Sequence, residues 1–125
     1  MHGSNIIVDG GRVSGLIDFA ETVAQPADAE LDTILRWCAR SPEYPPSPQS
    51  TGLPEGSLAA LPGWLSDAYP DLFESADLRE RLNVYDAYVE LSLYAHHPGP
   101  EVREMSRGRL ARLLEGRNHL DALTW

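Results

Sequence analysis

The sequence predicts an α+β fold that is mainly helical, with an N-terminal β-hairpin followed by four or five helices. Two observations predict the hairpin. Residues 5–8 and 12–18 are rich in β-branched side chains, and the Asp9-Gly10-Gly11 segment between them can adopt the positive φ angles of a tight turn. A third observation predicts the helices, because apolar side chains recur at intervals of three and four residues from about residue 28 onward.

The second strand and the first helix each carry a specific signal. Gly15 interrupts the apolar run of the second strand, which indicates either a β-bulge or a close approach of another backbone segment. The first helix is predicted to begin near Asp28, whose side chain can cap it. One face of this helix is apolar and carries Leu31, Ile34, Leu35 and Cys38.

Proline and capping signals define the next two helices. Residues 57–68 are predicted to form a short helix in which Pro62 starts a second piece, because proline disrupts a helix interior. Residues 77–95 are predicted to form the longest helix, and Asp77 and Glu80 have the spacing of a capping box. The apolar repeat of this helix is Leu78, Leu82, Tyr85, Val89 and Leu93.

The last long helix is predicted to begin at Pro100 and to stop at Gly116. Its buried side chains are predicted to be Val102, Met105, Leu110, Leu113 and Leu114. The tail from His119 onward is expected to add one turn. Five prolines between residues 42 and 54 predict a surface loop ahead of the second helix.

All 125 residues are expected to form a single domain, with a hairpin and loop over 1–24 and a helical subdomain over 25–125. No apolar run approaches the roughly 20 residues that a membrane-spanning helix requires. No signal peptide is visible at the start. The single cysteine, Cys38, excludes an internal disulfide and suits a reducing compartment, so a cytoplasmic location is expected.

The net charge of the chain limits the classes of partner that it is expected to bind. Nineteen acidic residues stand against ten arginines, the chain contains no lysine, and the formal net charge is −9. Nucleic acid is therefore not an expected partner, because binding to phosphates normally needs a basic surface. A cationic small molecule fits this charge better, and the alternative is that the acidity only keeps the protein in solution.

Asn5 and Asp18 are the residues with the clearest chemical potential. Asn5 precedes the first predicted strand and Asp18 ends the second, so the hairpin should bring both side chains to one point. A carboxylate and an amide oxygen together suit a hard cation such as Mg²⁺. The alternative is that both residues only cap the ends of their strands.

The order of features around these residues resembles a known catalytic segment. His2-x-x-Asn5, an apolar strand, a glycine turn and Leu16-Ile17-Asp18-Phe19 resemble the aminoglycoside phosphotransferase family, relatives of choline kinases and protein kinases. In that family the motif runs His-Gly-Asp-x-His-x-x-Asn, then a hairpin, then Ile-Asp-Phe or Ile-Asp-Trp. The resemblance implies a protein-kinase-like fold in which Asn5 and Asp18 hold the Mg²⁺ ions bound to ATP.

The resemblance also implies supporting roles for other residues, and its specific part covers residues 1–35. The stretch from Pro26 to Asp32 is similar to the family's Gly-Asp-Pro-x-x-Asp-Leu, which implies that Asp32 braces the catalytic loop by hydrogen bonding. His2 either points toward the metal or, as we favour, hydrogen-bonds the backbone of its own loop. Glu21 either faces the acceptor substrate or is a solvated loop carboxylate.

The family transfers the γ-phosphate of ATP to a hydroxyl of a small molecule, but the 125 residues lack several parts of that machinery. The family's catalytic Asp stands five positions before the metal-binding Asn. Counted back from Asn5, that position falls immediately ahead of Met1. The strand lysine and the Gly-rich loop of the N-terminal lobe are also absent from these residues. The expectation is therefore a C-terminal lobe only, a truncated unit with no catalytic residue, inactive alone, whose own binding of Mg²⁺ and ATP is in question.

Two further expectations concern the helical surface and the hairpin. Seven carboxylates of the helical region either attract a polycationic acceptor or form a solvated surface together with interspersed arginines: Asp67, Asp71, Glu74, Asp77, Glu80, Asp86 and Glu90. Without its partner lobe the hairpin would expose Ile6, Val8 and Leu16, which predicts a homodimer or docking of the missing lobe. The alternative function is a non-catalytic oligomeric binding or regulatory module derived from that lobe.

Overall fold

The structure is a computed structural model that describes residues 5–18, 24–40, 43 and 57–125. Its elements, in chain order, are β1 (Ile6–Asp9), β2 (Arg12–Leu16), α1 (Ala27–Arg40), α2 (Ser57–Ala68), η3 (Pro70–Leu72), α3 (Leu78–His96), α4 (Pro100–Leu114) and η4 (His119–Ala122). The predicted α+β, mainly helical fold with an N-terminal antiparallel hairpin and four α-helices is confirmed. None of the described helices is long and apolar enough to cross a membrane.

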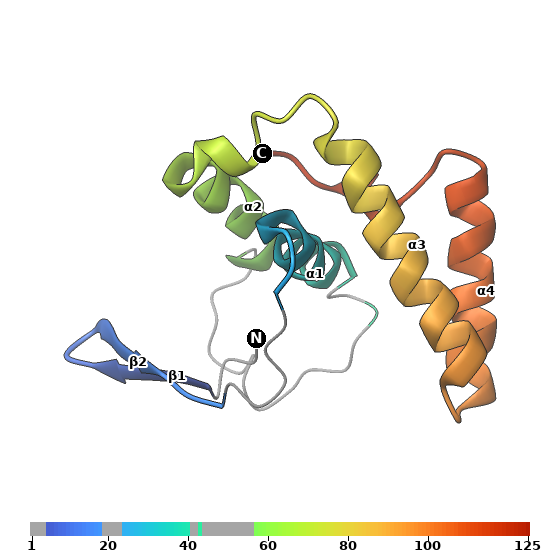
Figure 1. Ribbon diagram of the computed structural model, residues 1–125, viewed down its shortest axis with the longest axis horizontal. Coiled ribbons are helices and arrows are strands. Elements are labelled where there is room, and N and C mark those ends of the chain that lie inside the picture. The colour runs from blue at the N-terminus through green and yellow to red at the C-terminus, as the bar shows by residue number, and fades with distance from the viewer. Residues whose placement is uncertain (1–4, 19–23, 41–42, 44–56) are drawn as a thin grey trace.

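The β1–β2 hairpin projects from the helical part of the molecule (Figure 1). Its turn has φ angles of +54° at Gly10 and +76° at Gly11. Glycine adopts such angles without steric cost, so the Gly-Gly pair closes the turn as predicted. The predicted strands and the observed ones agree to within two residues at each end.

A β-bulge lies beside Gly15. Ile7 pairs with Gly15 and Val8 pairs with Val13, so Ser14 falls between the two pairs and adds one residue to β2. The Ser14 hydroxyl donates a hydrogen bond to the carbonyl of Ile7 at 3.3 Å. A Cβ built on Gly15 would lie 3.6 Å from the Ile7 side chain, an ordinary contact. Of the two interpretations of Gly15, the bulge is therefore the one that the structure supports.

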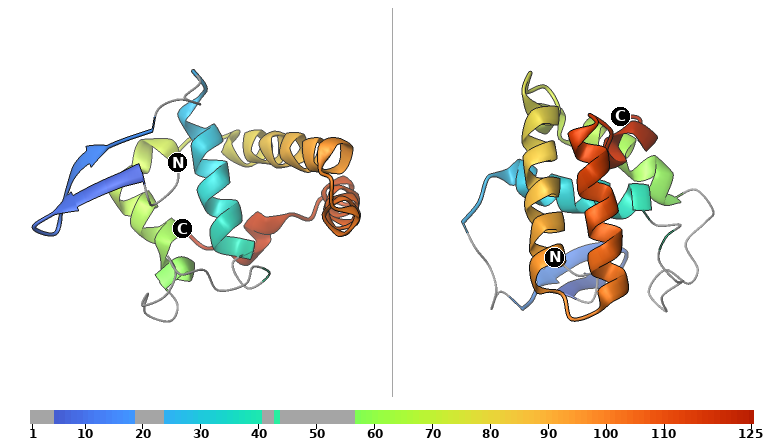
Figure 2. Two further views of the ribbon diagram at one scale, coloured as in Figure 1. Left: turned by 90° about the horizontal axis from the view of Figure 1, so that it is seen from below. Right: turned by 90° about the vertical axis from the view of Figure 1, so that its right-hand side faces the viewer.

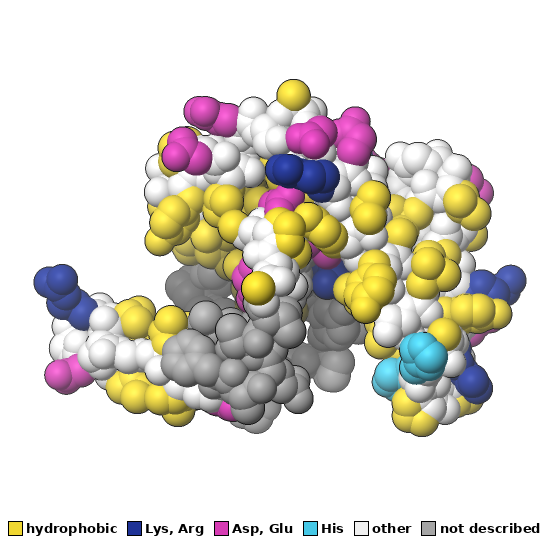
Figure 3. All heavy atoms as spheres, in the orientation of Figure 1, with side chains coloured by type: hydrophobic (Ala, Val, Ile, Leu, Met, Phe, Trp, Pro, Cys, Tyr) yellow, Lys and Arg dark blue, Asp and Glu magenta, His cyan; other side chains and the backbone are white. Residues whose placement is uncertain are grey.

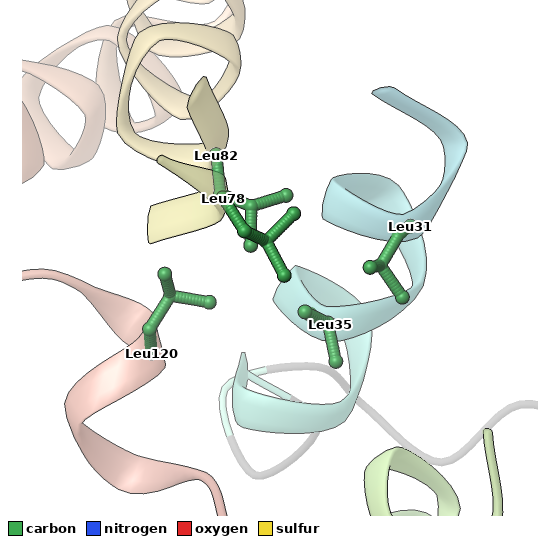
Figure 4. Packing of buried hydrophobic residues seen from close by; sticks show 5 residues of the cluster. All are labelled: Leu31, Leu35, Leu78, Leu82 and Leu120. Atoms are coloured by element: carbon green, nitrogen blue, oxygen red, sulfur yellow. The ribbon is translucent and has the colours of Figure 1, made fainter. Parts of the chain in front are cut away.

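The apolar core lies between α1, α3 and η4, and Figure 4 shows its side chains converging from these three elements. It consists of five leucines, each at most 4% exposed: Leu31, Leu35, Leu78, Leu82 and Leu120. Cys38 is also buried, as the predicted apolar face of α1 requires, and Ile34 is half-buried. Helix α1 contacts α2, α3 and η4, which makes it the central helix of the fold (Figure 2).

The α3–α4 pair differs from its prediction. The two helices pack against each other, but the side chains buried on α4 are Ser106 and Arg109 rather than apolar residues. Met105 is 39% exposed and Leu114 is 92% exposed, so the prediction that both are buried is wrong. Val102, Leu110 and Leu113 are half-buried. Arg109 is buried because its counterion, Glu90 of α3, is buried opposite it.

Two predicted helix signals are also corrected. Helix α2 runs through Pro62 without a break; the proline lies in the helix interior, where it removes one backbone hydrogen bond but does not end the helix. Asp77 makes no capping hydrogen bond at the start of α3; its carboxylate accepts a hydrogen bond from Ser75 instead. A capping box is found at η4, where Asn118 and Asp121 exchange hydrogen bonds.

The remaining predicted ends of the helices are confirmed to within two residues, but Asp28 lies inside α1 and its carboxylate pairs with Arg81 instead of capping the helix. Helix α4 begins at Pro100, and Gly116 follows its end with a φ of +73°, the left-handed conformation that favours glycine there. The tail forms the short helix η4. The predicted proline-rich surface loop lies outside the described residues, apart from Glu43.

Candidate functional site

The open end of the hairpin brings Asn5 close to Asp18. The backbone N–H of Ile17 donates a hydrogen bond to the carbonyl of Asn5 at 2.9 Å, and Ile6 pairs with Leu16 in the adjoining ladder. Asn5 therefore lies opposite the residue that directly precedes Asp18. Asp18 is exposed and Asn5 is partly exposed. The two residues share one end of the hairpin and are open to solvent there.

Asp18 has an unusual backbone. Its φ is +63°, and among the described residues it is the one non-glycine residue with a positive φ. Side chains in a regular strand alternate between two faces, which would send Asn5 and Asp18 to opposite sides of the ribbon. Strand β2 ends at Leu16, and the left-handed conformation of Asp18 ends this alternation. Aspartate tolerates that conformation better than most residues do.

The side chains of Asn5 and Asp18 carry oxygen atoms of the kind that hard cations bind, and two such ligands would leave most of the coordination shell to other groups. Mg²⁺ is usually held by one or two carboxylates, with water and phosphate oxygens completing its shell. Within the described part of the chain, no group of three or more His, Cys, Asp or Glu side chains could hold a metal ion. Asn5 and Asp18 therefore offer at most two of the oxygen ligands that such an ion needs.

The other predicted site residues fall into two groups. His2 and Glu21 lie outside the described residues. Asp32 is described: it is 1% exposed on α1, and its carboxylate lies 2.9 Å from Nε of Arg36 and 3.6 Å from Nε2 of His119. The segment that it was expected to brace, residues 1–4, is not described. Its role in supporting that segment therefore stays a prediction.

Asp32 belongs to a group of buried ionisable residues that joins four elements. We call this group the charge cluster: Asp32, Arg36 and Arg40 of α1, Asp86 and Glu90 of α3, Arg109 of α4, and His119 of η4. Six of the seven are buried and Arg36 is half-buried. The cluster occupies the space between helices where apolar side chains were expected.

Arg40 and Glu90 form the centre of the charge cluster. One guanidinium nitrogen of Arg40 donates to both carboxylate oxygens of Asp86, at 3.0 and 3.1 Å, and another donates to Oε1 of Glu90. Arg109 donates to the same Oε1 at 3.2 Å. Glu90, which is 0% exposed, thus accepts hydrogen bonds from α1 and from α4 at once.

His119 connects η4 to the charge cluster. Its Nδ1 lies 3.2 Å from Oδ2 of Asp86, and its Nε2 faces Asp32. Burial by itself would raise the pKa of Asp86, but the hydrogen bond with His119 and the charge of Arg40 lower that pKa below its ordinary value. Asp32 shows the opposite balance: burial raises its pKa from 3.8 to about 6, and the charges of Arg36 and His119 offset this only in part.

A separate ion pair secures the start of α1. Asp28 is buried in the first turn of α1, and its carboxylate lies 2.8 Å from Nε of Arg81. The hydroxyl of Tyr85 donates to the other oxygen of Asp28 at 3.3 Å. These contacts tie the first turn of α1 to α3.

Asp86 and Glu90 were assigned to a solvated or substrate-binding acidic surface, and the structure corrects this. Both are buried and paired with arginine. A signal for their burial was present, because Leu78 and Leu82 continue every four residues to Asp86 and Glu90 on one row of the helix. The other five carboxylates of that set are exposed: Asp67, Asp71, Glu74, Asp77 and Glu80.

No protein-family model matches the chain, and no curated protein or solved structure matches it either. The chemistry of the site therefore follows from the residues themselves. Two features stand out: a pair of oxygen donors at the open end of a hairpin, and a buried charge cluster that holds the helices in place.

Removing the charge of Arg40 should destabilise the fold strongly. Arg40→Met leaves Asp86 and Glu90 buried without their main counterion, so the free energy of unfolding should fall by about 3–5 kcal/mol. Urea unfolding followed by circular dichroism measures this change. Arg107→Met is the matched control, because Arg107 pairs with Glu104 on the exposed face of α4. Its midpoint should stay near that of the wild type, and equal losses in both variants would contradict a special role for the cluster.

The raised pKa of Asp32 makes stability depend on pH in a defined direction. Between pH 4 and pH 6 the folded state keeps the proton of Asp32 while the unfolded state has lost it. The free energy of unfolding contributed by this group therefore falls as pH rises from about 4 to about 6, and it is constant above that range.

Asp32→Asn should flatten this decline in urea unfolding measured between pH 4 and pH 7. Asp86, whose pKa is lowered, contributes stability that is lost only as the pH falls below its ordinary value of 3.8. Asp67→Asn, at an exposed position of α2, is the control and should leave the wild-type profile unchanged. Parallel profiles for the wild type and Asp32→Asn would refute this assignment.

Proposed function

We propose that this chain is the C-terminal lobe of a small-molecule phosphotransferase similar to the aminoglycoside phosphotransferases, with a kinase-like arrangement of hairpin and helices. The observation that carries the proposal is the hydrogen bond between Ile17 and Asn5. It sets the Asn of one motif beside the Ile17-Asp18 pair of the other, as shared binding of one metal ion requires.

In this proposal Asn5 and Asp18 are the protein ligands of the nucleotide's Mg²⁺. Asn5 offers an amide oxygen and Asp18 a carboxylate, and both are accessible to a phosphate-bound ion. The ion, when bound, neutralises charge on the phosphates of ATP. Asp32 is a positioning residue: its buried carboxylate would accept hydrogen bonds from the segment ahead of Asn5.

The 125 residues do not contain the complete catalytic machinery. They include no lysine and no Gly-rich phosphate loop, so contacts to the nucleotide phosphates must come from another lobe. We therefore propose that these residues alone transfer no phosphate. The acceptor is a small molecule with a hydroxyl group, and a cationic one suits the net charge of −9.

A second function is favoured by the surface of the hairpin. Five apolar side chains there are between 42% and 65% exposed: Ile7, Val8, Val13, Leu16 and Ile17. Figure 3 shows hydrophobic side chains at the surface of the hairpin, on the left of the view. An exposed apolar ribbon favours association, so the same lobe would serve as a non-catalytic module that pairs with a second copy or with a partner lobe.

Binding of Mn²⁺, a paramagnetic substitute for Mg²⁺, tests the metal site. We expect Mn²⁺ to broaden the amide resonances around Asn5 and Asp18 in NMR spectra of the wild type. Asn5→Ala and Asp18→Ala should each weaken this effect at least about tenfold, because each removes one of two protein ligands. Asp9→Ala, at the exposed end of β1 next to the turn, is the control and should leave the broadening unchanged.

Two outcomes would contradict the phosphotransferase proposal as stated. Equal broadening in the wild type and in Asp18→Ala would show that Asp18 does not bind the metal ion. Transfer of radiolabelled phosphate from ATP to aminoglycosides or small alcohols by this chain alone, abolished in Asp18→Ala, would show that the 125 residues are catalytically complete.

Light scattering tests the second function. The wild type should self-associate at high micromolar concentration, and Val13→Glu should shift it toward the monomer, since a charge on the ribbon opposes apolar contact. Val84→Glu on α3 is a matched control, because Val13 and Val84 are both 65% exposed. A monomeric wild type, or equal effects of the two substitutions, would exclude association through the hairpin.

A further inference from the structure

A cavity of about 190 Å³ lies at the end of α1 that is remote in sequence from the hairpin, and no hairpin residue lines it. Its walls come from α1, α3, α4, η4 and Glu43. Four of the ten arginines of the chain line this one cavity: Arg40, Arg109, Arg112 and Arg117. Such a concentration is notable in a chain whose net charge is −9.

We propose that this cavity binds a small phosphate-type oxyanion, either inorganic phosphate or a small phosphate monoester. Arginine is suited to such a ligand, because its planar guanidinium donates two parallel hydrogen bonds to the oxygens of one phosphate or carboxylate. The proposal does not depend on the phosphotransferase assignment, since the lining residues belong to the helical part of the molecule.

Two of the four arginines are held in place before any ligand binds. Arg40 is 6% exposed and Arg109 is 3% exposed, and both donate to Oε1 of Glu90. Asp86 fixes the other side of the Arg40 guanidinium. Binding an anion therefore costs little side-chain entropy at these two residues, which is the main gain from preorganisation.

Most charges on the cavity wall are paired, and one arginine is left for an anion. Four guanidinium groups line the cavity together with the carboxylates of Glu43 and Asp86, and Glu90 pairs with Arg40 and Arg109 from outside the lining. Asp86 is engaged by Arg40 and His119. Arg117 is exposed and is paired with Glu115. Arg112, exposed in the last turn of α4, belongs to none of the ion pairs among the described residues and is the arginine that supplies positive charge to a ligand.

Glu43 shows which chemistry the cavity accepts. Its carboxylate accepts a hydrogen bond from Arg109, and its side chain is 45% exposed. A partly exposed carboxylate of the chain thus already accepts a hydrogen bond from the guanidinium of a buried arginine. A phosphate oxygen has the same acceptor character, so an incoming phosphate would compete with Glu43 for Arg109.

The volume of the cavity and the dipoles of two helices limit the size of the ligand and the affinity for it. Pockets for drug-sized molecules have volumes of about 300–1,000 Å³, so this cavity suits an anion smaller than a nucleotide. Helices α1 and α4 both end at the cavity, at Arg40 and Leu114, and each C-terminus contributes roughly half a negative charge. These partial charges oppose the positive charge of Arg112, so weak binding of the anion is expected.

The proposal is tested by NMR titration of the full ¹⁵N-labelled chain with inorganic phosphate and, in a separate arm, with glycerol phosphate. Ionic strength is held constant with chloride. Saturable shifts of the amides of Arg40, Arg109 and His119 are expected. Tighter binding of glycerol phosphate would identify a monoester as the ligand, and tighter binding of inorganic phosphate would identify the free ion.

Three variants separate a specific site from general attraction. Arg112→Ala should weaken phosphate binding about tenfold, because it removes one charge-assisted donor at the cavity wall. Arg107→Ala removes the same charge from the same helix outside the cavity and should leave the affinity unchanged. Glu43→Gln should tighten binding, because it removes the competing carboxylate.

Several results would overturn the proposal. They are the absence of saturable shifts in both arms, equal losses in Arg112→Ala and Arg107→Ala, and an affinity that does not rise in Glu43→Gln. Both arginine variants alter exposed side chains, and circular dichroism checks that each remains folded.

Discussion

The helical part of this protein depends on one shared acceptor, the buried carboxylate of Glu90. Among the described residues the apolar core joins α1, α3 and η4, and α4 contributes no leucine to it. Helix α4 packs along α3 and is linked to α1 through Arg109, which shares Oε1 of Glu90 with Arg40 of α1. A single carboxylate thus connects three helices.

We infer that the charge cluster contributes more to the specificity of the packing than to the stability of the fold. Burying a charge costs several kcal/mol of desolvation free energy per ion, and the attraction within the ion pairs roughly offsets that cost. Apolar side chains of the same shape could therefore stabilise the fold equally well. The charged version tolerates few alternative packings, because a misplaced carboxylate would be left unpaired. It also orients Arg40 and Arg109 toward the cavity between α1 and α4, so the residues that hold the helices together also supply half of its arginines.

The sequence predicts the elements of this fold well and its interior less well. Asp9-Gly10-Gly11 predicts the hairpin turn, and the hydrogen bond that sets Asn5 beside Asp18 follows from that turn. The interior of the α3–α4 pair could not be predicted by counting apolar residues, because Asp86 and Glu90 stand in the row begun by Leu78 and Leu82. A carboxylate in such a row is buried only if an arginine from another helix reaches it, and that contact is known only from the three-dimensional packing.

Native-state hydrogen exchange across a series of urea concentrations tests the role of Glu90 most directly. If the charge cluster unites the helices, the amides of α4 around Arg109 will exchange through the same global opening as those of α1 and α3, with one free energy and one dependence on urea. Exchange of the α4 amides through a separate opening of much lower free energy, with α1 and α3 still protected, would contradict this account.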